Sequence, residues 1–303
     1  MLIALLPPWL WAVFTVIAAG AQTARNVMQR DLVASVGTQG ATYVRFLFGL
    51  PFALLFLGAQ LLLIDAPLPI PGLHALGWAA VGALMQTMAT ALMLLSMQDR
   101  SFVVTIAFTK TEPVIIAILS IVILREVPTL TTALAIIVAT AGVLLMSLPP
   151  RTAGAERPGL KAALIGLASG ACFGFSATGY RVSMVGLESS SFILTASVTM
   201  VMGLTIQCGA ILGWLLLRDR ALLGAIVRNW RPSLLAGFMG ALATQFWFLA
   251  FAITNPIRVR TLALVEVPFA QVVSRRIFKQ RMSNAEIAGM ALIVAGVVLL
   301  LNG

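Results

Sequence analysis

Apolar runs of about 20 residues recur along the whole chain, separated by short segments that contain proline, glycine or charged residues. A helix of that length crosses the apolar layer of a membrane, which is about 30 Å thick. The pattern therefore predicts an all-α membrane protein with ten transmembrane helices. The expected spans are residues 8–29, 40–63, 73–97, 102–124, 130–148, 160–183, 191–217, 232–254, 259–278 and 284–301.

The two halves of the chain resemble each other at an offset of 154 residues. Glu112 corresponds to Glu266, and the sequence Ala141–Gly142–Val143 corresponds to Ala295–Gly296–Val297. A linker from Pro149 to Pro158 divides the chain into a first five-helix repeat, residues 1–150, and a second, residues 151–303. Because five is an odd number, the second copy enters the membrane upside down. We expect one integral membrane domain built from two inverted repeats.

Composition agrees with this prediction and narrows the possible partners. The chain of 303 residues is 60% hydrophobic and 10% charged, which is not the composition of a soluble domain. The net charge of +10 comes from basic residues in short interhelical loops. Such residues set topology and meet anionic lipid headgroups, so membrane lipids are expected partners and nucleic acid is not. Cys172 and Cys208 lie inside apolar runs and are interpreted as packing residues.

Lys110 and Glu112 lie within the apolar run 102–124, and Glu266 lies at the matching place in the second half. A carboxyl group at membrane depth is costly and usually has a functional role. Two such groups at repeated positions suggest a substrate-binding or coupling site between repeats. Pro113 and Pro268 follow the glutamates, and each removes a backbone hydrogen bond, so they are candidate hinges.

Structural explanations for these charges remain open. Glu112 could form an interhelical ion pair, or stay protonated beside the proline, and Glu266 could pair with Arg258 or Arg260. Lys110 has no counterpart, because the matching position is Leu264. Two carboxylates with one ammonium make a polarised site, which suits a substrate that carries both charges.

Other polar and aromatic residues could line the same cavity, although ordinary interhelical hydrogen bonding is an alternative for each. Gln86 and Thr90 are four residues apart and share a helix face. Arg25 could reach the cavity or act as a snorkelling anchor. The further candidates are Asn26, Tyr180, Gln245 and Trp247.

The sequence contains no motif for catalysis or for a cofactor. It has no HExxH, GxSxG or Walker A sequence. We therefore expect neither an enzyme nor a cofactor or metal site.

The fourth and fifth predicted helices carry a family resemblance. Glu112–Pro113 is followed by a long apolar run, then Arg125–Glu126, then a helix that ends in Ala141–Gly142–Val143. This arrangement resembles the EamA branch of the drug/metabolite transporter superfamily, and the duplicated layout agrees over essentially the whole chain. The second copy departs from the family, because Phe278–Lys279–Gln280 stands where a glycine–glutamate pair is common. The resemblance implies transport of small metabolites, often export.

Together these features predict a secondary transporter that moves a small zwitterionic or polar metabolite, amino-acid-like and exported, by alternating access through a midplane cavity. The arginine-rich composition is typical of a bacterial source, which indicates the inner membrane. Coupling to protons and a monomeric or dimeric state remain open. Two alternatives also remain open: a proton-coupled exporter of cationic drugs, and a non-transporting membrane scaffold. The absence of an acidic residue from the first helix, together with Arg25, disfavours the drug exporter.

Overall fold

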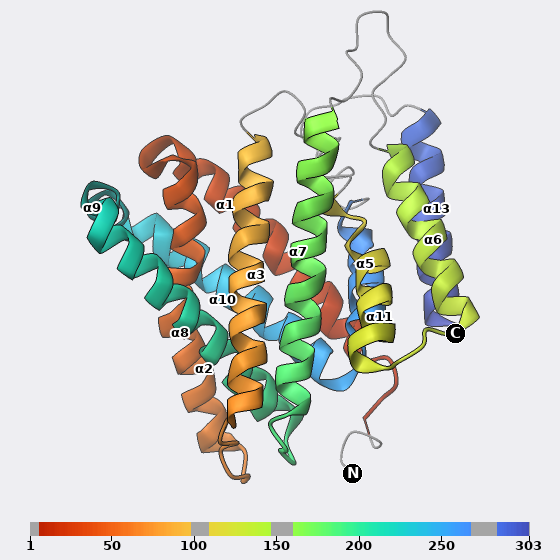
Figure 1. Cartoon of the computed structure of the whole chain (residues 1–303), viewed down its shortest axis with the longest axis horizontal. Coiled ribbons are helices and arrows are strands. Elements are labelled where there is room, and N and C mark those ends of the chain that lie inside the picture. The colour runs from red at the N-terminus through yellow and green to blue at the C-terminus, as the bar shows by residue number, and fades with distance from the viewer. Residues whose placement is uncertain (1–5, 98–108, 147–159, 268–283, 303) are drawn as a thin grey trace, which may run out of the picture. The chain divides into compact units, whose positions relative to one another are not determined.

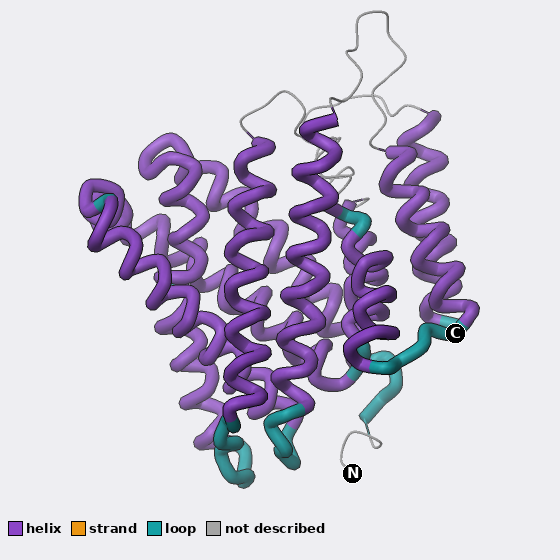
Figure 2. Tube along the Cα trace, viewed as in Figure 1, coloured by secondary structure: helices purple, strands orange, loops and turns teal. Residues whose placement is uncertain are grey.

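The computed structural model describes residues 6–97, 109–146, 160–267 and 284–302, and the regular structure within these ranges is helical (Figure 2). The elements are α1 (Leu10–Leu47), α2 (Gly49–Leu63), α3 (Leu73–Met97), α5 (Glu112–Leu119), the π-helix η2 (Ser120–Leu124), α6 (Leu130–Met146), α7 (Leu160–Val185), α8 (Phe192–Arg218), α9 (Arg220–Arg228), α10 (Trp230–Ile253), α11 (Pro256–Leu262), the 3₁₀-helix η3 (Ala263–Val265) and α13 (Asn284–Leu301). Figure 1 labels the α-helices among them.

Helices that are long and apolar enough to cross a membrane confirm an all-α membrane protein. Within the described ranges, four such helical segments span Asp31–Leu63, Leu73–Met93, Phe192–Arg218 and Trp230–Ile253. Three shorter apolar helices cover Glu112–Leu124, Leu130–Leu145 and Ile287–Leu301. The arrangement of ten helices as two inverted repeats stays a prediction.

The first two predicted helices have different boundaries from those expected. Helix α1 continues through residues 30–39, which the sequence pattern assigned to a loop. Gly37 is the one residue of α1 with non-helical backbone angles, at φ 68° and ψ 174°. Because glycine has no Cβ, it reaches this positive φ without strain and lets the chain kink without a loop. A single residue, Phe48, then separates α1 from α2.

The segment between the seventh and eighth predicted helices contains an unexpected short helix, α9. Asp219 starts it, since its side chain accepts a hydrogen bond of 2.9 Å from the backbone N–H of Leu222. An aspartate at this position satisfies a backbone donor that the first turn of a helix leaves unpaired. The sequence pattern missed α9 because its arginines were interpreted only as loop charges.

Unit 1 is one of two compact units and contains Met1–Thr87 and Gly179–Asn255. Within it, α10 packs along α1 and also contacts α2 and α8. Small residues allow this approach: a Cβ added at Gly237 of α10 would lie 2.4 Å from the Cβ of Phe48. Glycines also allow α3 and α7 to pack closely, since a Cβ on Gly179 would lie 3.2 Å from the backbone nitrogen of Gly82.

Unit 2 contains Met88–Thr178 and Pro256–Gly303, and α6 and α13 are its most extensive helix pair. They run antiparallel (Figure 1) and meet at two glycines. A Cβ on Gly142 would lie 2.6 Å from the carbonyl oxygen of Gly289, and one on Gly296 would lie 2.8 Å from the Cβ of Ala139. Gly142 and Gly296 are the central residues of the repeated Ala–Gly–Val sequence, so the duplicated motif forms a helix–helix contact.

Each unit combines segments from both predicted halves, 1–150 and 151–303. The compact units and the predicted repeats are thus two different divisions of the chain. The repeat boundary near residue 150 lies outside the described residues and stays a prediction.

Candidate functional site

Two irregular stretches of helix in unit 2 position the repeated glutamates. The predicted helix 102–124 is not continuous where described, because Lys110 and Thr111 form a turn and α5 begins at Glu112. In the second half, α11 gives way to the 3₁₀-helix η3, and Glu266 follows it directly. The residues 109–111 and 263–265 are separated by the repeat offset of 154. A change of helix type within a helix often marks a functional hinge or strain.

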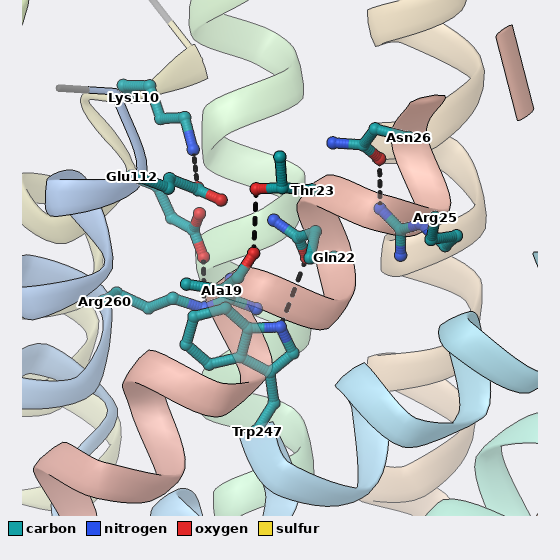
Figure 3. A network of polar contacts seen from close by, with 10 residues as sticks. Ala19, Gln22, Thr23, Arg25, Asn26, Lys110, Glu112, Trp247 and Arg260 are labelled. Atoms are coloured by element: carbon teal, nitrogen blue, oxygen red, sulfur yellow. Dashed lines mark hydrogen bonds and ion pairs between the residues drawn. The ribbon is translucent and has the colours of Figure 1, made fainter. Parts of the chain in front are cut away.

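Both glutamates form ion pairs within unit 2. The Lys110 ammonium pairs with Glu266, and Arg260 Nε lies 3.2 Å from Glu112 Oε1. Figure 3 shows Lys110, Glu112 and Arg260 with these contacts as dashed lines. Glu112 and Glu266 are each only 8% exposed, and the side chains of their partners Lys110 and Arg260 are partly buried. Such pairs are stable only while both charges are present.

The pairs join the two halves of the sequence in a crossed arrangement. Each half supplies one carboxylate and one cation, and each carboxylate pairs with the cation of the other half. The expected polarised set of two carboxylates and one ammonium is therefore corrected. Arg260 is a second cation of the group, and the four charges sum to zero.

Arg260 was considered from the sequence, but as a partner for Glu266 and not for Glu112. It lies six residues before Glu266, a spacing that does not bring two side chains together on a helix. Its actual partner, Glu112, is 148 residues away in sequence. Arg258 was the other suggested partner for Glu266; that carboxylate pairs with Lys110.

A second set of candidates lies in unit 1, on α1 and α10. Arg25 is 5% exposed and donates a 2.7 Å hydrogen bond from Nη2 to Asn26 Oδ1. Trp247 Nε1 donates to Gln22 Oε1 at 3.2 Å, which Figure 3 also shows. The burial of Arg25 inside the unit differs from the snorkelling anchor considered from the sequence. A Cβ added at Gly240 would lie 3.3 Å from its Cδ, so a glycine on α10 makes room for the arginine stem.

One chain of two hydrogen bonds and one separate amide–amide hydrogen bond link the helices of unit 1. Gln245 Nε2 donates to Ser197 Oγ at 2.8 Å, and Ser197 Oγ donates in turn to Gln60 Oε1 at 2.5 Å. Gln207 Nε2 donates to Gln86 Oε1 at 2.8 Å. The partners Gln60, Ser197 and Gln207 were not predicted, because the sequence does not show which helices are neighbours.

Tyr180 serves mainly as a packed side chain in unit 1. Its ring lies against two glycines, since a Cβ on Gly82 would be 3.0 Å from Tyr180 Cγ and a Cβ on Gly203 would be 2.6 Å from its hydroxyl oxygen. The ring centroid is 4.6 Å from that of Phe248. The Tyr180 hydroxyl donates to Gln86 Oε1 at 3.5 Å, a long contact.

The remaining predicted residues fall in different places. Thr90 is buried and lies on α3, one helical turn after Gln86. Pro113 is the second residue of α5, where a missing N–H leaves no intrahelical bond unmade. Pro268 lies outside the described residues. Among the residues that are described, no group of three or more His, Cys, Asp or Glu side chains could hold a metal ion.

The apolar helices and the buried, paired charges define a polytopic helical membrane protein. Residues 6–148 match the EamA-like transporter family. The match places the first half of the chain in the drug/metabolite transporter superfamily, and the family suggests a membrane transporter of small molecules. Members of the family are transporters rather than enzymes.

A solved structure shares the fold over nearly the whole chain. This crystal structure of a protein is similar with a TM-score of 0.66 and 14% sequence identity. The match covers 95% of this chain and 98% of the other. At this identity the likeness shows the fold alone. Among curated proteins, no sequence matches significantly.

Proposed function

We propose that this transporter moves a small zwitterionic, amino-acid-like metabolite out of the cell by alternating access, through a cavity between two inverted repeats. The arginine-rich composition supports a bacterial inner membrane as its location. The proposal rests on the family, on the repeated features of the chain and above all on the crossed ion pairs.

Three pairs of features at the repeat offset support the inverted repeat. The irregular stretches 109–111 and 263–265 correspond, as do Glu112 and Glu266. Gly142 and Gly296 also correspond, and they lie on helices that pack antiparallel. Equivalent helices pack antiparallel when two copies are related by a two-fold axis in the membrane plane. Transporters with such repeats bind substrate near broken helices at the repeat interface.

We infer the substrate class from the crossed ion pairs of unit 2. Breaking one buried pair leaves an uncompensated charge, which is strongly unfavourable. A zwitterion brings one charge of each sign. Its ammonium pairs with one of the protein carboxylates, and its own carboxylate pairs with the Lys110 or Arg260 that this carboxylate has released. A plain cation satisfies the carboxylate but leaves the freed protein cation without a counter-charge. The electroneutral group therefore favours a zwitterion over a cationic drug.

Transport assays on the purified protein in proteoliposomes test this proposal. We expect counterflow of at least one amino acid, and we expect Glu112→Gln and Glu266→Gln each to reduce it by tenfold or more. Glu126→Gln is the matched control, because that carboxylate is exposed and belongs to neither pair.

Two results would contradict the proposal. One is the absence of counterflow for every amino acid while the protein remains folded. The other is efflux of lipophilic cations that disappears in Glu112→Gln, which would establish the cationic-drug exporter instead.

A further inference from the structure

A short basic helix at one end of unit 1 has no role in the proposed transport site. Helix α9 follows α8 after Asp219 and is followed by α10 after Asn229. Its nine residues extend about 14 Å, too short to cross an apolar layer of about 30 Å. Figure 1 shows α9 at the end of α8, where the chain turns back into α10. Because α8 and α10 are both long enough to span, this turn is expected at the membrane surface.

One face of α9 is anchored to the unit and the other is open. Ile226 is 1% exposed, and Leu222, four residues earlier, lies near Gly40 of α1. Arg220, Val227 and Arg228 are exposed on the rest of the helix. The apolar face of α9 therefore packs against the unit, and its basic face is the one open to the surroundings.

Arginine–tryptophan pairs flank the helix on both sides. The Arg218 guanidinium carbon lies 6.0 Å from the ring centroid of Trp214, and that of Arg231 lies 5.5 Å from Trp230. The two indoles are 57% and 50% exposed. Exposed tryptophans concentrate at the headgroup level of membranes. We call these six residues the α9 surface: Trp214, Arg218, Arg220, Arg228, Trp230 and Arg231.

The charge on the α9 surface is positive and is not neutralised within the segment. Asp219 is the single acidic residue between Trp214 and Arg231, and its carboxylate caps α9. At the opposite end of α8, the loops 64–72 and 186–191 contain Asp65 and Glu188 and no lysine or arginine. By the positive-inside rule, this asymmetry turns the α9 surface toward the cytoplasmic leaflet, which carries anionic lipids.

We propose that the α9 surface is a binding site for anionic phospholipids. Arginines bind the headgroup phosphate through charge-assisted hydrogen bonds, for which the planar guanidinium is well suited. Arg220 already donates from Nε to the Leu216 carbonyl at 2.8 Å, which fixes its stem and leaves its terminal N–H groups for the phosphate. The exposed Leu217 and Val227 lie beside these arginines in sequence and provide apolar contact for the acyl chains.

Lipid retention measured by native mass spectrometry of the full chain tests this site. The probes are phosphatidylglycerol and phosphatidylcholine with identical acyl chains, added to the protein in detergent. We expect phosphatidylglycerol to be retained preferentially. The double variant Arg220→Gln/Arg228→Gln should lose affinity for it by about fivefold for each arginine removed.

Two controls keep the result specific. Arg220→Lys/Arg228→Lys preserves the charges and should retain most of the binding, which shows that a loss in the glutamine variant is not misfolding. Arg125→Gln removes an exposed arginine of unit 2 and should leave lipid binding unchanged.

The proposal is overturned by equal retention of the two lipids, or by equal phosphatidylglycerol binding in wild type and the glutamine double variant. An equal loss in Arg125→Gln also overturns it, because the effect would then be general charge. Displacement of the lipid by millimolar inorganic phosphate would show a site for free phosphate instead.

Discussion

At the residue scale, the four charges of unit 2 depend on one another. Glu112 and Glu266 were evident from the sequence, because acidic residues are rare within apolar runs and these two repeat. Their partners were less evident: Lys110 and Arg260 pair with glutamates more than 140 residues away, and no local spacing reveals such contacts. The sequence thus indicates which charges need partners, while the fold determines which partners they have.

This dependence predicts a non-additive effect on stability. Lys110→Met or Glu266→Gln alone should destabilise the protein by about 3–5 kcal/mol, because each leaves a largely buried charge without its counter-charge. The double variant removes both charges and should be less destabilised than the sum of the two. Thermal unfolding in detergent measures the cycle, and additive losses would show that the pair is not energetically coupled.

At the scale of elements, the sequence predicted apolar helices well and their interruptions poorly. The run around Glu112 was predicted to be one continuous helix. A turn or a short 3₁₀ or π segment inside an apolar run does not change its hydrophobic pattern, so the sequence does not reveal it. At Gly37 the error was the reverse: the sequence predicted a loop where the helix continues. The less apolar stretch was interpreted as a loop, whereas the backbone of Gly37 alone makes the turn. The repeated Ala–Gly–Val sequence was recognised as a repeat signal, and the structure adds its role at the contact between α6 and α13.

That contact predicts sharply different effects for two glycine substitutions. Gly142→Ala should destabilise the protein by about 1–3 kcal/mol, because the new methyl would lie 2.6 Å from a backbone carbonyl that cannot easily move. Gly209→Ala in α8 is the matched control: no atom lies within 4 Å of the added Cβ, and alanine favours the helix. The midpoint of thermal unfolding in detergent should fall for the first and stay or rise for the second. A fall of equal size in both would contradict the packing account.

At the scale of the whole molecule, the compact units of the chain combine segments from its two sequence halves. Segments from both halves meet in unit 2, and there the duplicated glutamates and glycines lie together. The sequence alone could suggest the duplication but not this exchange of segments. We propose that this electroneutral group of paired charges accepts a substrate that carries one charge of each sign.

Inhibition of counterflow by charge-altered analogues tests that claim most directly. The amino acid with the strongest counterflow is compared with its methyl ester, a cation, and its N-acetyl derivative, an anion. We expect the unlabelled amino acid to compete well and each analogue to be at least tenfold weaker, because either analogue leaves a buried protein charge unpaired. Competition by the methyl ester that equals or exceeds that of the amino acid would contradict it.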